Sequence, residues 1–157
     1  MPATSSIPAA IDYLVTNIGA LTECAAPVIV EDGWPTRSAP SGVAVGVIPG
    51  DGITDDEVTH AQLGAQMEWE VYEIPCIVWC HVGGSSAKAA RDGAFTIYNA
   101  IVALVRTNPA GRTLGGALNS NVAIVHNVRV VQTDTAEDAG EGRRCEIRFS
   151  VGCKNRF

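Results

Sequence analysis

The stretch EWEVYEIPCIVWCHV, residues 68–82, is the longest strand-like run in the chain and sets its fold class. In its second half both alternating sets of positions are apolar, Ile77 and Trp79 included, so this part of the strand is expected to be covered on both faces. In its first half the apolar residue Val71 is at an odd-numbered position, whereas the apolar residues expected to face the core in the second half are at even-numbered positions. We therefore predict a β-bulge at residues 73–75, where a proline is tolerated.

Two helices and four more strands are predicted around this run. Apolar residues recur every three or four positions from Ile7 to Ile18 and from Ala90 to Val105, as in helices with one buried face. The other strands are expected at residues 28–30, 43–48, 122–130 and 145–153. The order α-β-β-β-α-β-β predicts an α+β fold, a mostly antiparallel β-sheet with two main α-helices packed on it.

Length and composition indicate one globular unit. The 157 residues fit a single domain spanning 1–157, with long loops at 49–66 and 134–142. A hydrophobic content of 46% with 18% charged residues excludes wholesale disorder. No basic residue precedes Arg37, and the longest uncharged apolar helical candidate, residues 94–105, is far shorter than the roughly 20 residues that cross a bilayer. We expect no secretory signal and no membrane contact.

Charge is divided unevenly along the chain. Residues 1–80 contain 11 acids and one base, whereas residues 81–157 contain ten bases and six acids, within a net charge of -6. The negative total disfavours binding of nucleic acid through the whole surface. Two halves of opposite sign suit a subunit that packs head-to-tail with copies of itself, because such contacts use two different patches.

A zinc site is the first chemical possibility, since Cys76, Cys80 and His81 lie close in sequence. Four residues along a strand span about 13 Å, too far for two thiolates to share one zinc ion. His81 would also point to the face opposite Cys80. The chain contains five cysteines and no CxxC pair, so we expect free, buried thiols and no metal site.

Other site motifs are equally incomplete. The turn at residues 83–86 lacks the phosphate-loop spacing and is better explained by a serine that caps the following helix. His126 shares one strand face with Val122, Ile124, Val128 and Val130, and is interpreted as a hydrogen-bonded core histidine on that apolar face. No nucleophile motif surrounds a serine or cysteine, so we predict no catalytic residue, no cofactor and no enzymatic activity. The acids Asp51, Asp55, Asp56 and Glu57 do not fit a calcium loop and read as a solvated acidic loop.

Several local patterns follow one another in a recognisable order. After the first helix come VIVEDG at residues 28–33 and GDG at residues 50–52. Then follow EIPCIVW at residues 73–79, ARDGAF at residues 90–95 and LGG at residues 114–116. In this order, over residues 5–157, the chain resembles tail terminators of long-tailed (siphovirus-type) bacteriophages of actinobacteria. It departs from the family pattern at residues 40–60 and 134–142.

The resemblance implies a structural role in the virion. Such terminators form a hexameric ring on the head-proximal end of the tail tube, end its polymerisation and join the tail to head-completion proteins. The implied partners are copies of the chain, the tail-tube protein and a head-completion or stopper protein, with DNA only passing through the lumen. The implied locations are the tail or neck of the virion and, during assembly, the host cytoplasm.

Charged residues are our candidates for ring or stacking contacts, with solvated loop charge as the alternative. Another head–tail connector or a tail-tube component is an alternative function. A small ligand-binding domain or enzyme, with a pocket near His60, His81 or His126, is a more distant one. The candidate contact residues are Asp51, Asp55, Asp56, Glu57, Asp134, Glu137, Asp138, Glu141, Arg143 and Arg144.

Overall fold

The computed structural model describes residues 5–46, 69–84, 86–119, 122–135 and 142–156. Their elements confirm the predicted α+β class and the order of its main helices and strands, with a short 3-10 helix and a four-residue helix in addition. In chain order they are α1 (Ile7–Gly19), η1 (Thr22–Cys24), β1 (Ile29–Asp32), β2 (Ser41–Val45), β3 (Trp69–Gly83), α2 (Ala87–Thr107), α3 (Pro109–Arg112), β4 (Ile124–Thr135) and β5 (Gly142–Arg156).

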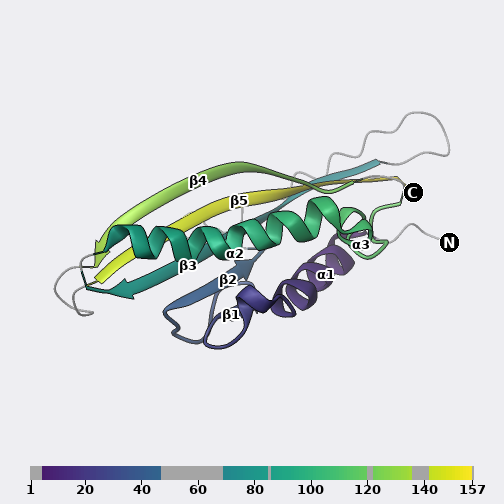
Figure 1. Ribbon diagram of the computed structural model, residues 1–157. Coiled ribbons are helices and arrows are strands. Elements are labelled where there is room, and N and C mark those ends of the chain that lie inside the picture. Colours follow the sequence, from purple (N-terminus) through teal and green to yellow (C-terminus); the bar gives the residue numbers. More distant parts are fainter. Residues whose placement is uncertain (1–4, 47–68, 85, 120–121, 136–141, 157) are drawn as a thin grey trace.

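The strands form one five-stranded sheet in the order β1-β2-β3-β5-β4. β1 runs parallel to β2, and every other neighbouring pair is antiparallel. The two long strands β3 and β5 lie at the centre, so β1 and β4 are the edges (Figure 1).

Both main helices cover the same face of the sheet, which we call the helix face (Figure 1). α2 packs on β3 and β5, while α1 packs beside β1 and β2. The predicted helical stripes are buried here, with Leu14, Ile18, Ile101 and Val105 fully enclosed. All five cysteines are free and buried, as expected. The main core therefore lies between the helices and this face.

A buried carboxylate fastens the start of α1 to the start of β3. Glu70, only 2% exposed, accepts hydrogen bonds from the Ser6 backbone N–H at 2.8 Å and the Ser6 hydroxyl at 2.7 Å. Ser6 is the N-cap residue of α1, but its side chain makes no bond to the helix backbone. Because Glu70 bonds the N–H of the N-cap residue, it takes the part that a Glu three residues into the helix plays in a capping box.

The predicted bulge at residues 73–75 is wrong. β3 and β5 pair without a register shift from Trp69 to Gly83, and the even positions of β3 face the helices throughout. The misleading signal was Val71, which is 42% exposed on the other face. Pro75 fits at this position because it lies opposite the end of β2. Its carbonyl accepts a hydrogen bond from the N–H of Gly46, the residue after the last one of β2, and a backbone N–H at residue 75 would have no β2 residue to pair with.

A register shift occurs instead in β4, between His126 and Arg129. Asn127 adopts a positive φ of 55° there, and the shift exchanges the two faces of the strand. Val130 consequently pairs with Ile147 on the helix face, whereas His126 pairs with Ser150 on the opposite face. The prediction that the valines of this strand share one buried face with His126 is therefore wrong.

Element ends differ modestly from those predicted. β4 continues to Thr135 and β5 begins at Gly142, so both ends of the predicted 134–142 loop belong to strands. The predicted loop at 49–66 lies outside the described residues. Among the described residues, no helix is long and apolar enough to cross a membrane.

Candidate interaction surface

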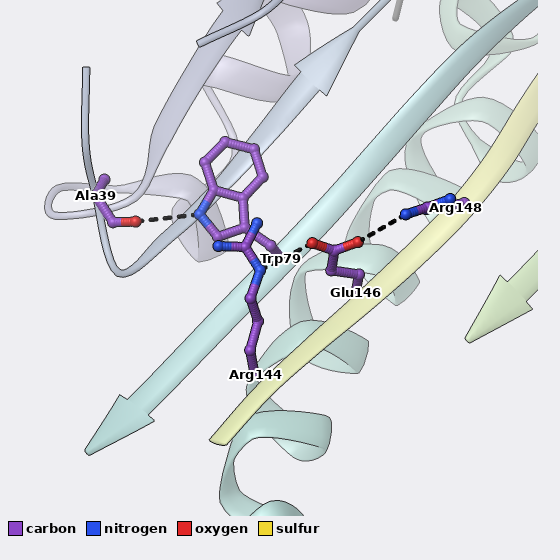
Figure 2. A network of polar contacts seen from close by, with 5 residues as sticks. All are labelled: Ala39, Trp79, Arg144, Glu146 and Arg148. Atoms are coloured by element: carbon purple, nitrogen blue, oxygen red, sulfur yellow. Dashed lines mark hydrogen bonds and ion pairs between the residues drawn. The ribbon is translucent and has the colours of Figure 1, made fainter. Parts of the chain in front are cut away.

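The face of the sheet opposite the helices, which we call the outer face, carries a small apolar cluster. Ile77 and Trp79 of β3 are 3% and 5% exposed, although no helix lies over them. They pack with Ala44 of β2 and Ile29 of β1. The segment between β1 and β2 folds over this cluster, and the carbonyl of Ala39 accepts a hydrogen bond from the Trp79 indole N–H at 3.1 Å (Figure 2). The prediction that this half of β3 is covered on both faces is confirmed.

A glycine makes room for the indole. Gly42 pairs with Trp79 across β2 and β3, and a Cβ atom at residue 42 would lie 2.5 Å from the Trp79 ring and 2.8 Å from Ile29. Any larger residue would displace the ring. Gly42 therefore fixes where Trp79 lies on the outer face.

Charged side chains of β5 surround this cluster. Glu146 accepts from the Arg144 Nε at 2.8 Å and from an Arg148 terminal nitrogen at 3.3 Å (Figure 2). The Arg144 guanidinium also lies 5.9 Å from the centre of the Trp79 ring, within range of a cation–π contact. Arg148 Nε is buried without a hydrogen-bond partner among the described residues. Two arginines share one carboxylate, so the network keeps a net positive charge.

Beside the network is a shallow cavity of about 170 Å³. Trp34, which is 59% exposed, and the buried Trp79 provide aromatic surface, and Arg37 and Arg144 provide guanidinium groups. Arg37 also pairs with Glu31 at 2.7 Å. Aromatic surface beside arginines suits a partner segment that presents an apolar side chain next to a carboxylate.

His126 belongs to the outer face and not to the core, which corrects its interpretation. Its Nε2 lies 3.2 Å from Glu73 Oε1, and Asn127 donates to the other Glu73 oxygen at 3.4 Å. The imidazole crosses β5 above Gly152, where a Cβ atom would lie 2.7 Å from His126 Nε2. A strand glycine marks such a close approach, but only the pairing of β4 with β5 shows that His126 is the residue above it.

Most of the predicted contact residues lie outside the described residues. Asp134 is described only as a backbone position of β4, where it pairs with Arg143. Arg143 and Arg144, predicted as one pair, lie on opposite faces, since Arg143 pairs with Val82 and Arg144 with His81 of β3. The predicted residues outside the described ranges are Asp51, Asp55, Asp56, Glu57, Glu137, Asp138 and Glu141.

The cysteines belong to the core and not to a chemical site. Burial raises the pKa of the Cys76 and Cys153 thiols to about 12 and that of Cys24 to about 11. Such thiols stay protonated at neutral pH and are poor nucleophiles and ligands. Within the described part of the chain, no three His, Cys, Asp or Glu side chains gather as a metal site. His60 lies outside that part.

The turn before α2 behaves as expected. Ser86 is the N-cap residue, and its hydroxyl accepts from the Ala89 N–H at 3.1 Å. The prediction of a capping serine at this turn is confirmed.

The edge strand β4 carries exposed apolar residues that the sequence pattern did not predict. Ile124, Val128 and Val130 are 58%, 47% and 43% exposed, and Val122 just before β4 is 44% exposed. An apolar edge strand offers both unpaired backbone groups and hydrophobic side chains, so it favours pairing with another chain. The outer face and the edge strand β4 together form a surface that is suited to contacts with another protein chain.

A scan against known protein families and a search of curated protein sequences found no match to this chain.

Proposed function

We propose that this chain is a structural virion protein, a tail terminator that forms a ring, of six subunits in the family it resembles, on the head-proximal end of a phage tail tube. The ring would end tube polymerisation and offer the surface that joins the tail to a head-completion or stopper protein. DNA would pass through its lumen, and no bond would be made or broken.

The observation that carries this proposal is the separation of opposite charges across the sheet. Acidic Glu23, Glu31 and Asp32 lie at the β1 side, partly offset by Arg37. The β4–β5 side has more bases than acids, since its two strands contain Arg129, Arg143, Arg144, Arg148, Lys154 and Arg156 against Asp134 and Glu146. A ring needs two different patches on each subunit that attract each other, and opposite charge at two ends supplies that attraction.

The ordered sequence patterns favour a terminator over related assembly proteins. Another head–tail connector or a tail-tube component would share the need for self-association. A ligand-binding domain or enzyme would instead need a deep, enclosed pocket. The outer-face cavity of about 170 Å³ is smaller than the roughly 300–1,000 Å³ typical of such pockets, and a larger hollow of about 420 Å³ beside β1 is open and not enclosed.

Native mass spectrometry of the full chain, followed by negative-stain imaging, tests the proposal. We expect particles of six subunits with a central hole, either alone or after addition of tail tubes. Long tubes would indicate a tail-tube component. A monomer that forms no ring when tail tubes are added would contradict the proposal.

Arg143 and Arg144, which lie on opposite faces of the sheet, allow a second test. Arg144→Glu places an acid beside Glu146 and Trp79 on the outer face, whereas Arg143→Glu changes the helix face. We expect at least one reversal to weaken ring formation or joining of tails to heads. Intact rings and normal joining in both variants would remove these residues from the contacts.

A further inference from the structure

The two edges of the sheet differ in a complementary way. The β4 edge presents exposed apolar side chains, Val128 and Val130 among them. The β1 edge borders an open hollow of about 420 Å³, lined mainly by small and apolar residues that include Pro27, Val28 and Val30. Among the described residues, each of these two strands pairs with only one neighbour. One edge thus projects apolar side chains, and the other offers an apolar recess.

Strand directions determine how two copies would meet. β1 is parallel to β2, and three antiparallel steps lead from β2 to β4, so β4 runs opposite to β1 within one subunit. If rotation about a ring axis extends the sheet from copy to copy, β4 meets the neighbour's β1 as an antiparallel pair. The helix faces of all copies then lie on the same side, and the contact is heterologous, as ring closure requires.

The faces of the residues select one register. Val130 of β4 shares the helix face with Ile147, and Val30 of β1 shares it with Val43, so the two valines can oppose each other. This register places Arg129 opposite Glu31 on the outer face. It also places Val131 opposite Ile29. Shifting the register by two residues, which keeps the faces, removes the opposition of Arg129 and Glu31.

We propose that β4 of one subunit pairs antiparallel with β1 of a second copy, Val130 opposite Val30 and Arg129 opposite Glu31, and that this contact closes the ring. The proposal deepens the proposed function by naming the subunit interface, and it rests on that function only for ring closure. Backbone hydrogen bonds give the contact its strength, while the apolar recess and the charge pair set its direction.

Blocking each edge separately tests the contact. Val130→Lys places a charge opposite Val30 in the apolar recess, and Glu31→Lys/Asp32→Lys places one lysine opposite Arg129 and the other opposite Val128. We expect the dissociation constant between subunits to rise about 100-fold or more in each variant, because an unpaired charge in an apolar contact and two like charges opposite each other each cost several kcal/mol. Val71→Lys is the matched control, since Val71 is equally exposed but lies on the inner strand β3.

Mixing the two blocked variants distinguishes the outcomes by analytical ultracentrifugation. Each has one intact edge, so the mixture should form a one-to-one dimer that neither variant forms alone. Self-dimers of the Glu31→Lys/Asp32→Lys variant would show β4 pairing with β4 and overturn the proposal. Rings from both variants would overturn it while leaving the proposed function standing.

Cysteine pairing tests the register. Directly opposed residues in an antiparallel pair have Cα atoms about 4.5–5.5 Å apart, which suits a disulfide. Under oxidation, the Arg129→Cys/Glu31→Cys variant should cross-link copies into covalent rings, with Arg129→Cys/Asp32→Cys as the control on the wrong face. Cross-linked open chains would support the contact and contradict ring closure, and so the proposed function. Wild-type protein that stays monomeric with and without tail tubes would overturn both.

Discussion

The two faces of the sheet are built differently, although the same strands supply both. The helix face buries a large cluster beneath α1 and α2, including all five cysteines. The buried apolar cluster of the outer face, in the described part of the chain, consists of Ala44, Ile77 and Trp79, which a loop and a set of charged side chains cover. The first arrangement stabilises the monomer, and the second leaves polar and aromatic groups where a partner can reach them.

The largest expected effect compares one isoleucine from each face. Ile147 and Ile77 are both buried, on adjacent strands. Ile147→Ala should lower the free energy of unfolding by about 4 kcal/mol, because the packed helices cannot collapse into the cavity. Ile77→Ala should cost about 2 kcal/mol, since the covering loop can settle inward. Urea unfolding with unchanged m-values measures both, and equal costs would mean that the outer cluster is as rigid as the main core.

Alkaline pH should act through the helix face. Cys76 and Cys153 keep their protons in the folded protein up to a pKa of about 12, whereas the unfolded thiols titrate near 9. The contribution of these two thiols to the free energy of unfolding is therefore fully present below pH 9. It falls as the pH rises toward 12, by up to about 1.4 kcal/mol per pH unit for each thiol. Unfolding curves at pH 8, 9 and 10 measure this slope. The Cys76→Ala variant should have a shallower slope, and an unchanged one would contradict the assignment.

A smaller effect concerns the space over Gly42. Gly42→Ala should cost about 2 kcal/mol, because its methyl group overlaps the Trp79 ring and Ile29. Trp79→Phe alone should cost about 1.5 kcal/mol through loss of the bond to Ala39 and of buried area. The double variant should cost clearly less than the sum of the two, since phenylalanine leaves room for the methyl group. Additive costs in the double-mutant cycle would show that the clash is relieved elsewhere.

The smallest expected effect compares the stability contribution of the charged network around Glu146 with that of a single ion pair on the surface of α2. Glu146, whose side chain is 15% exposed, pairs with two arginines, whereas the ion pair of Asp92 among the described residues is with the exposed Lys88. Glu146→Gln should cost about 1 kcal/mol, and Asp92→Asn no more than about 0.5 kcal/mol. Thermal unfolding in low and high salt compares the two. A larger cost for Asp92→Asn would mean that the outer-face network contributes little to the monomer.

The periodicity of apolar residues predicted the helices and most strands because most of these elements have one buried face and one solvent-exposed face. The capping serine of α2 and the burial of the cysteines followed from local chemistry in the same way. The bulge was misplaced because Val71 is an apolar residue on an exposed face, and sequence alone does not reveal exposure. Of the candidate contacts, Arg143 and Arg144 could have been assigned to opposite faces from the alternation of the strand.

Sequence by itself determined the fold class, the order of the main elements and the buried faces of the two helices and of β5, since these depend on spacing along the chain. Tertiary structure decided which strands became edges, that Glu70 secures α1, and that His126 and Trp79 lie over glycines on the outer face. These features join residues far apart in the chain through the pairing of whole strands. No local pattern encodes that pairing, because it depends on how all the segments pack together.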